Sequence, residues 1–148
     1  MFIFRLQKAL EYRIEEEEKF KKEFLLKKNT LDLEKEKLHF AELEIVDTIH
    51  KFNDLRKGTL NALSLRNYES YLRKIKENKV NQEKVVENWK RIVEEAKEVF
   101  IEARKEKKIL EKLKEKKYEI YRQDELKKEQ KFIDELSNSM YNRRNFNG

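Results

Sequence analysis

The sequence predicts an all-α fold, a long antiparallel coiled-coil hairpin of two helices in which the second helix is longer than the first. Apolar residues recur at heptad spacing on both sides of Gly58, as they do in coiled coils. The chain has no proline, and no other glycine precedes Gly148. Charged residues make up 45% of the chain and apolar residues 38%, which suits a narrow seam better than a multilayered core. We expect one elongated domain over residues 1–148.

The first helix is expected over about residues 3–57. A heptad series that begins at residue 3 is apolar at every position except Glu17, and the series three residues further on is half apolar. Asn29 and Thr30 form the one locally weak stretch, which should not break a helix without glycine or proline. The strong series consists of Ile3, Leu10, Glu17, Phe24, Leu31, Leu38, Ile45 and Phe52.

A bend is expected at about residues 58–63. Gly58 suits the left-handed position just past a helix end, and the preceding Arg56 and Lys57 suit the negative end of the helix dipole. Ser64 is the expected N-cap of the second helix. A connection of this length makes the two helices antiparallel neighbours.

The second helix is expected over about residues 64–140, followed by a disordered tail at about 141–148. Its apolar stripe is wider than two columns, and Asn78 and Gln82 place polar groups within it, a device that fixes register. The main column consists of Tyr68, Ile75, Gln82, Trp89, Ala96, Ala103 and Leu110, flanked by Tyr71/Leu72, Val85/Val86, Ile92/Val93 and Val99/Phe100.

Folding the chain at about residue 61 places residue i opposite roughly residue 122 − i. The acidic run 15–18 then lies opposite the basic residues of 104–108. The last ~20 helical residues overhang without a partner in their own chain. They carry an apolar stripe that predicts a partner elsewhere, made of Leu126, Ile133, Leu136 and Met140.

The sequence offers no candidate catalytic, cofactor-binding or metal-binding residue. His39 and His50 are about three helical turns apart, too far to share a metal ion, and two glycines cannot form a phosphate-binding loop. There are no cysteines, no signal peptide and no apolar stretch long enough to span a membrane. Acidic and basic residues alternate, which argues against a nucleic-acid footprint. We therefore expect a cytosolic protein that is not an enzyme.

Large apolar side chains cluster near the bend. A two-helix tip cannot bury all of them, so some are expected to be exposed as anchors for a protein partner. The alternative is that they close the end of the coiled coil. The cluster consists of Phe52, Tyr68, Tyr71, Leu72 and Ile75.

The chain resembles the FliJ family of flagellar type III export proteins in the order and spacing of several segments. The opening residues 2–13, FIFRLQKALEYR, are similar to the start of the family, and residues 68–72, YESYL, resemble its Tyr-x-x-aromatic-Leu segment. Residues 104–108, 110–114 and 129–135 also resemble it. The resemblance covers nearly the whole chain.

This resemblance implies a hairpin similar to the central stalk of rotary ATPases, in the cytoplasm at the flagellar basal body. It implies binding to the flagellar export ATPase ring, to the cytoplasmic domain of an export-gate membrane protein and, in some members, to export chaperones. The candidate ATPase-binding residues are Phe4, Arg5, Leu6, Leu10, Arg122, Leu126, Lys127, Lys128, Lys131, Phe132, Ile133 and Leu136. The candidate gate-binding residues are Phe52, Tyr68, Tyr71, Leu72 and Ile75.

Three other interpretations stay open at the level of sequence. A generic coiled-coil scaffold or holdase chaperone of another pathway would bind through its tip or sides without coupling to an ATPase. A basic rod that binds nucleic acid would show a steep salt dependence. Self-association through the overhang is also compatible with the pattern.

Overall fold

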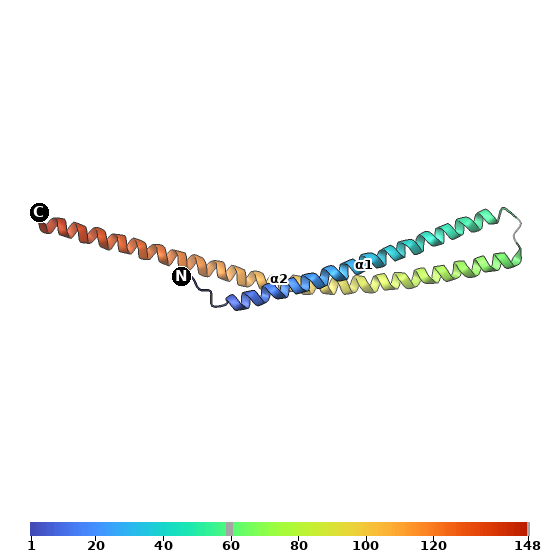
Figure 1. Ribbon diagram of the computed structural model, residues 1–148, viewed down its shortest axis with the longest axis horizontal. Coiled ribbons are helices and arrows are strands. Elements are labelled where there is room, and N and C mark those ends of the chain that lie inside the picture. Colours follow the sequence, from blue (N-terminus) through green and yellow to red (C-terminus); the bar gives the residue numbers. More distant parts are fainter. Residues whose placement is uncertain (59–60, 148) are drawn as a thin grey trace. The chain divides into compact units, whose positions relative to one another are not determined.

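A computed structural model describes residues 1–58 and 61–147. These residues form two helices and no strand, α1 over Gln7–Leu55 and α2 over Ala62–Asn147 (Figure 1). The predicted fold of two helices with the second one longer is therefore confirmed. The chain divides into two compact units, Met1–Glu17 with Ala103–Gly148, and Glu18–Glu102. Each unit is described by itself below.

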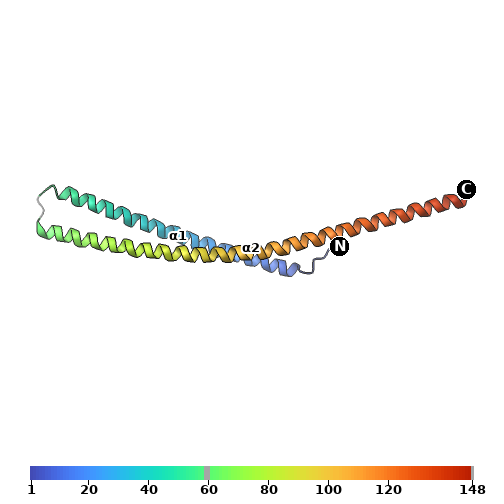
Figure 2. The ribbon, with the colours of Figure 1, turned by 180° about the vertical axis from the view of Figure 1, so that it is seen from behind.

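The unit Glu18–Glu102 is an antiparallel helix pair. Its parts of α1 and α2 lie side by side in both ribbon views (Figures 1 and 2). Aromatic rings meet across it near both ends, with Phe24 and Phe100 stacked at 6.1 Å between centroids and Phe52 and Tyr68 at 5.5 Å. The buried apolar side chains between these pairs are Leu31, Ile45, Ile75, Val86 and Ala96. Burying one large aliphatic side chain contributes about 1.5–3 kcal/mol, so this short list of residues carries much of the pairing.

The unit Met1–Glu17 with Ala103–Gly148 contains the first turns of α1 and the C-terminal part of α2. Leu10 and Ala103 are buried within it, and the Phe2 ring packs on Tyr118 and Tyr121 at 5.3 and 5.6 Å between centroids. Apolar contacts with α2 therefore continue beyond the start of α1 into the non-helical segment 1–6.

The register between the helices is close to the prediction. The residue numbers of each contacting pair add up to between 115 and 124, which includes the predicted value of about 122. The expected pairing of the acidic run with the basic run is confirmed at Glu17 and Lys107, which form an ion pair.

The seam on α2 is narrower than predicted. Leu72, Val86, Val93 and Phe100 lie in the seam, whereas their neighbours Tyr71, Val85 and Val99 are exposed and Ile92 is half-buried. A helix with a single partner covers two columns of side chains, so the third column faces outward. Of the two polar residues predicted to lie in the seam, Asn78 and Gln82, only one does so.

Gln82 lies in the seam as predicted, and Asn78 does not. The Gln82 Nε2 donates to the backbone oxygen of Glu34 at 3.0 Å and to its carboxylate at 2.6 Å. Asn78 is exposed. The seam position in that turn is taken by the next residue, Lys79, which lies in one column with Leu72 and Val86. The register is therefore fixed here by one polar layer and not by two.

Three predicted helix ends are corrected. Helix α1 begins at Gln7 rather than at residue 3, because the preceding segment stays non-helical while Phe4 is buried. It ends at Leu55 rather than at residue 57. Helix α2 continues to Asn147 in place of the expected disordered tail at about 141–148, since nothing in this stretch interrupts a helix before the terminal glycine. Gly148 itself lies outside the described residues.

The chemistry of the bend also differs from the prediction. Gly58 does not have a positive φ, so it is not a left-handed cap. A Cβ at this position would meet only the Leu55 carbonyl oxygen, at 3.6 Å. Helix α2 begins at Ala62, and its cap is Asn61, whose Oδ1 accepts a hydrogen bond from the Ser64 backbone N–H at 2.8 Å. Asparagine at this position satisfies one of the free N–H groups of the first turn.

We predict that Asn61→Ala lowers the free energy of unfolding by about 0.5–2 kcal/mol, because the Ser64 N–H loses its acceptor. Urea unfolding followed by circular dichroism measures the change. The matched control is Ser64→Ala, which leaves the cap in place and should change stability less. A larger loss in the Ser64 variant would contradict the assignment of the cap.

Candidate binding surfaces

The N-terminal candidates divide into buried and exposed residues. Phe4 and Leu10 are only 9% and 4% exposed, because they pack within their own unit. Arg5 and Leu6 are exposed. The segment 1–6 and α2 together line a hollow of about 640 Å³, to which α2 contributes Lys117, Ile120, Tyr121 and Asp124. The buried pair thus holds the N-terminal segment on α2, and its exposed neighbours present the surface.

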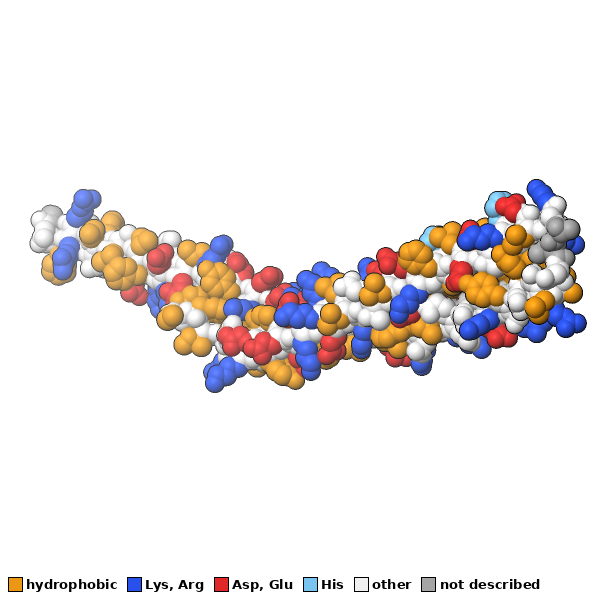
Figure 3. All heavy atoms as spheres, turned by 45° about the vertical axis from the view of Figure 1, so that its right-hand side comes forward, with side chains coloured by type: hydrophobic (Ala, Val, Ile, Leu, Met, Phe, Trp, Pro, Cys, Tyr) orange, Lys and Arg blue, Asp and Glu red, His pale blue; other side chains and the backbone are white. Residues whose placement is uncertain are grey.

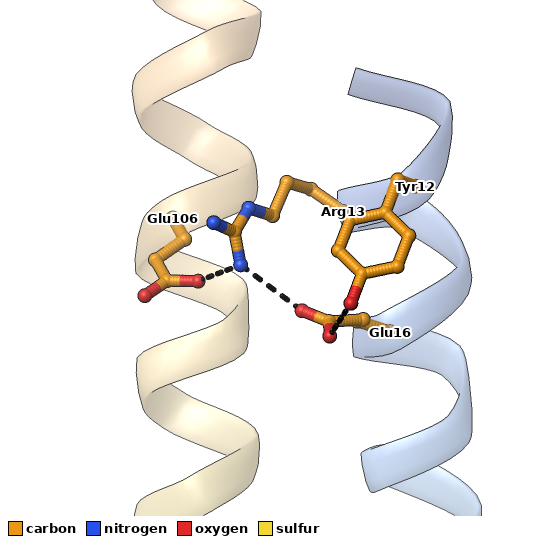
Figure 4. Close-up of polar contacts among 4 residues, drawn as sticks. All are labelled: Tyr12, Arg13, Glu16 and Glu106. Atoms are coloured by element: carbon orange, nitrogen blue, oxygen red, sulfur yellow. Dashed lines mark hydrogen bonds and ion pairs between the residues drawn. The ribbon is translucent and has the colours of Figure 1, made fainter. Parts of the chain in front are cut away.

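A polar cluster crosses the helix pair at Arg13. Its guanidinium lies between the carboxylates of Glu16 on α1, at 3.0 Å, and Glu106 on α2 (Figure 4). The Tyr12 hydroxyl donates to the other oxygen of Glu16 at 2.6 Å, and this bond with the nearby carboxylate raises the pKa of Tyr12. The sequence pattern placed Arg13 in the weak column of the seam but did not predict its partners.

The ion pair of Glu17 and Lys107 is the most enclosed charged pair in this unit, with side chains 15% and 22% exposed. The hydrogen bond to the Glu17 carboxylate raises the pKa of Lys107, although partial desolvation acts in the opposite direction. Glu111 adds a second carboxylate at 3.7 Å from the same ammonium group. This pair replaces an apolar layer at the one polar position of the strong heptad series.

The residues near the bend are brought together in part. Ile75 is buried, and Phe52, Tyr68 and Leu72 are half-buried, so these four close the seam as one alternative predicted. Tyr71 is the exposed member of the cluster. Beside it, a hollow of about 470 Å³ is lined by residues of both helices: Glu44, Asp47, Thr48, Lys51, Asn67, Tyr68 and Tyr71.

Tyr71 is held in place by a hydrogen bond across the helix pair. Its hydroxyl donates to the Glu44 carboxylate, which raises the pKa of Tyr71. Sequence reasoning missed this bond, and the signal that could have revealed it is the predicted register, which places the two residues within two helical turns of each other. The aromatic ring itself stays accessible beside the hollow.

The C-terminal part of α2, residues 122–147, is exposed at every position, and we call it the overhang. Its apolar stripe is as predicted from the sequence, with Leu126, Ile133, Leu136 and Met140 all exposed on one helix. Counting 100° per residue, the stripe is rotated by about 100° around the helix axis from the seam columns of Leu110 and Lys114. The stripe is therefore not a simple continuation of the seam.

The basic candidates of the overhang differ in their surroundings. Arg122 and Lys128 each make an ion pair one turn back along the helix, with Glu119 and Glu125 at 3.8 Å. Lys127 and Lys131 have no ion-pair partner among residues 1–58 and 61–147. Phe132 is also exposed. Figure 3 shows hydrophobic side chains interspersed with charges of both signs along α2.

The described part of the chain contains no group of three or more acidic, histidine or cysteine side chains that could hold a metal ion. No helix within residues 1–58 and 61–147 is long and apolar enough to cross a membrane. The candidate sites that the structure offers are open faces of helices. The fold and these surfaces define a two-helix coiled-coil protein whose accessible features are suited to binding other helices and proteins.

Comparison with known proteins identifies the family. The family model described as "FliJ: Flagellar FliJ protein" matches residues 1–146, and the chain therefore belongs to the FliJ family. It is a component of the flagellar export apparatus. The role of this family in the apparatus is non-enzymatic. Comparisons with curated proteins and with solved structures gave no significant match.

We predict that the stabilising effect of the Glu17–Lys107 pair is lost at alkaline pH. Because the pKa of Lys107 is raised in the folded chain, the pair contributes fully below the unfolded lysine value of about 10.4 and fades as the pH rises through the folded value. Urea unfolding from pH 7 to 11.5 should therefore show a difference between the natural chain and Glu17→Gln that shrinks above about pH 10.

The matched control for this titration is Glu15→Gln, which removes an exposed carboxylate of the same acidic run. Its difference from the natural chain should stay small and nearly constant, because exposed charges contribute little. A Glu17→Gln difference that is unchanged across the whole pH range would contradict the role of the pair.

Proposed function

We propose that this chain binds the flagellar export ATPase ring through the overhang and the N-terminal segment, promotes assembly or activity of the ring, and links it to the export gate. The proposal places the chain in the cytoplasm at the flagellar basal body. Family membership supports the general setting, and the exposed surfaces of the helix pair support the division of roles. Export chaperones are further proposed partners.

One observation carries the ATPase part of the proposal. The overhang keeps an apolar stripe over four turns although no residue from 122 to 147 is covered by its own chain. A stripe of this kind on an otherwise charged helix is typical of a binding surface. Lys127 and Lys131 lie on other faces of the same helix segment, and their charge would favour an acidic surface on the ring.

The N-terminal segment, residues 1–6, also supports the proposed binding to the ATPase ring. Arg5 and Leu6 are the accessible residues among the N-terminal ATPase-binding candidates. Phe4 and Leu10 are buried and hold this part of the chain against α2. We therefore assign direct contact with the ring to Arg5 and Leu6, and assign a positioning role to the two buried side chains.

The gate part of the proposal depends on Tyr71. It is the accessible aromatic ring of the cluster near the bend, it adjoins a hollow, and its hydroxyl is fixed by Glu44. A rigid aromatic side chain beside a recess is a typical anchor for a protein partner. Ile75 is buried and supports this surface from within the seam.

We predict that a chain ending at Tyr121 loses binding to the export ATPase, because the overhang is absent. Its helix pair should unfold at nearly the same urea concentration as that of the full chain, since residues 122–147 are all exposed and only Asp124 among them lines the hollow beside residues 1–6. Pull-down with the purified ATPase and measurement of ATP hydrolysis check the first statement, and circular dichroism checks the second.

A full-length variant separates the apolar stripe from the length of the helix. Leu126→Gln with Ile133→Gln and Leu136→Gln should weaken ATPase binding about as much as the truncation does. The control carries Leu43→Gln and Val46→Gln, two exposed apolar residues on α1. Unchanged ATPase binding by the truncated chain would overturn the proposal.

We also predict that Tyr71→Ala weakens binding to the cytoplasmic domain of the export gate by at least about tenfold, the cost of losing an anchor of about 1.4 kcal/mol or more. Tyr71→Phe keeps the ring and loses only the bond to Glu44, so it should bind nearly normally. Val80→Ala, at another exposed position of α2, is the control. Equal binding by the alanine variant and the natural chain in calorimetry would refute the assignment.

A further inference from the structure

A hollow on the helix pair Glu18–Glu102 contains polar groups that the chain itself leaves unused. Its volume is about 470 Å³, and residues of both helices line it. It adjoins Tyr71, the residue to which the proposed function assigns the export gate. The chemistry of its lining therefore indicates which kind of side chain a partner places there.

Thr48 is a buried polar side chain in the wall of this hollow. It is only 7% exposed, and its hydroxyl has no hydrogen-bond partner within residues 1–58 and 61–147. Thr30 on the same helix behaves differently, because its hydroxyl donates to the backbone oxygen of Leu26 at 3.1 Å. Buried polar groups are normally paired, so the Thr48 hydroxyl indicates that a group from outside the chain reaches into the hollow.

The wall also carries a carboxylate that is only partly used. Glu44 accepts a hydrogen bond from the Tyr71 hydroxyl at one of its oxygens, and it makes no ion pair with any residue that the structure describes. Asp47, the other carboxylate of the wall, is paired with Lys51 at 3.1 Å. The lining therefore keeps one negative charge without a counter-charge, which favours a positively charged ligand.

Two tyrosine rings complete the wall. Tyr71 is 46% exposed beside the hollow, and its bond to Glu44 holds the ring in place. Tyr68 is held from the other side by Phe52, at 5.5 Å between ring centroids. A cation above the face of a tyrosine ring is attracted to it, and in proteins this cation is more often arginine than lysine.

We propose that the hollow binds the guanidinium group of an arginine side chain supplied by the protein partner. A guanidinium group is planar and has five N–H donors, so it can stack on the Tyr71 ring while it donates to Glu44 and to the Thr48 hydroxyl. A lysine ammonium group has three donors around one point and does not stack, so it would use fewer of these groups. The inference rests on the proposed function only in taking the export gate as the source of the arginine.

Titration of the purified chain with capped amino acids tests the site without the partner. N-acetyl-arginine amide should shift the backbone NMR signals of the residues that line the hollow, with a dissociation constant of about 1–10 mM. N-acetyl-citrulline amide has nearly the same shape but no charge, and should cause no saturable shift. N-acetyl-lysine amide should bind at least about threefold more weakly than the arginine compound. Absence of binding by the arginine compound, or equal binding by either of the other two, would overturn the proposal.

Two variants test the assigned groups. Thr48→Val removes the hydroxyl and keeps the shape of the side chain, and Glu44→Gln removes the charge and keeps an acceptor for Tyr71. Each should raise the dissociation constant of the arginine compound at least about threefold. The matched controls are Thr30→Val and Glu42→Gln, which remove a hydroxyl and an exposed carboxylate of α1 outside the hollow. Circular dichroism verifies that each variant is folded, and equal weakening by a control would refute the assignment.

The purified cytoplasmic domain of the export gate connects the site with the proposed function. The arginine compound at millimolar concentration should weaken binding of this domain to the natural chain, and the citrulline compound should not. A chain that binds the arginine compound but not the gate domain would contradict only the proposed function. A gate domain that loses binding to Tyr71→Ala, yet is not displaced from the natural chain by the arginine compound, would contradict only the arginine in the hollow.

Discussion

Each helix of this protein can cover only two columns of side chains on its single partner, and the position of every other surface depends on that narrow seam. The buried apolar residues are few, and within residues 1–58 and 61–147 no side chain is almost completely enclosed. A seam of this kind specifies register weakly through apolar contacts alone, since a shift by one heptad replaces one aliphatic layer by another. Polar layers at Gln82–Glu34 and Glu17–Lys107 remove that freedom, because a shift would leave their polar groups unpaired.

The helical pairing and its register follow from heptad spacing and from the absence of helix breakers, and both were predictable. The details at the ends of the helices were not. Asn61 rather than Ser64 caps α2, because an N-cap is decided by which side chain reaches a free N–H group, and several polar residues compete within one turn. Gly58 correctly predicted where the chain bends. The left-handed backbone conformation predicted for it was wrong, because its φ is not positive.

The candidate surfaces were predictable to the extent that they depend on what the seam leaves uncovered. The apolar stripe of the overhang is visible in the sequence because the predicted register pairs it with no residue of the first helix. Phe4 and Leu10 could not be separated from Arg5 and Leu6 in this way, since a heptad pattern does not show how a non-helical segment such as residues 1–6 returns to α2. Tyr71 stands out only when the third column of α2 is known to face outward.

The overhang has to remain helical without the support that packing usually gives. Local pairs along it supply part of the stabilisation, among them Arg122 with Glu119, Lys128 with Glu125, and Gln130 with Asp134. Each such pair contributes about 0.2–0.5 kcal/mol, and the helix is already nucleated by the paired part of α2. Because every residue from 122 to 147 is exposed, a partner of the stripe would not have to displace α1. The local pairs therefore let the overhang stay helical while its apolar stripe remains accessible.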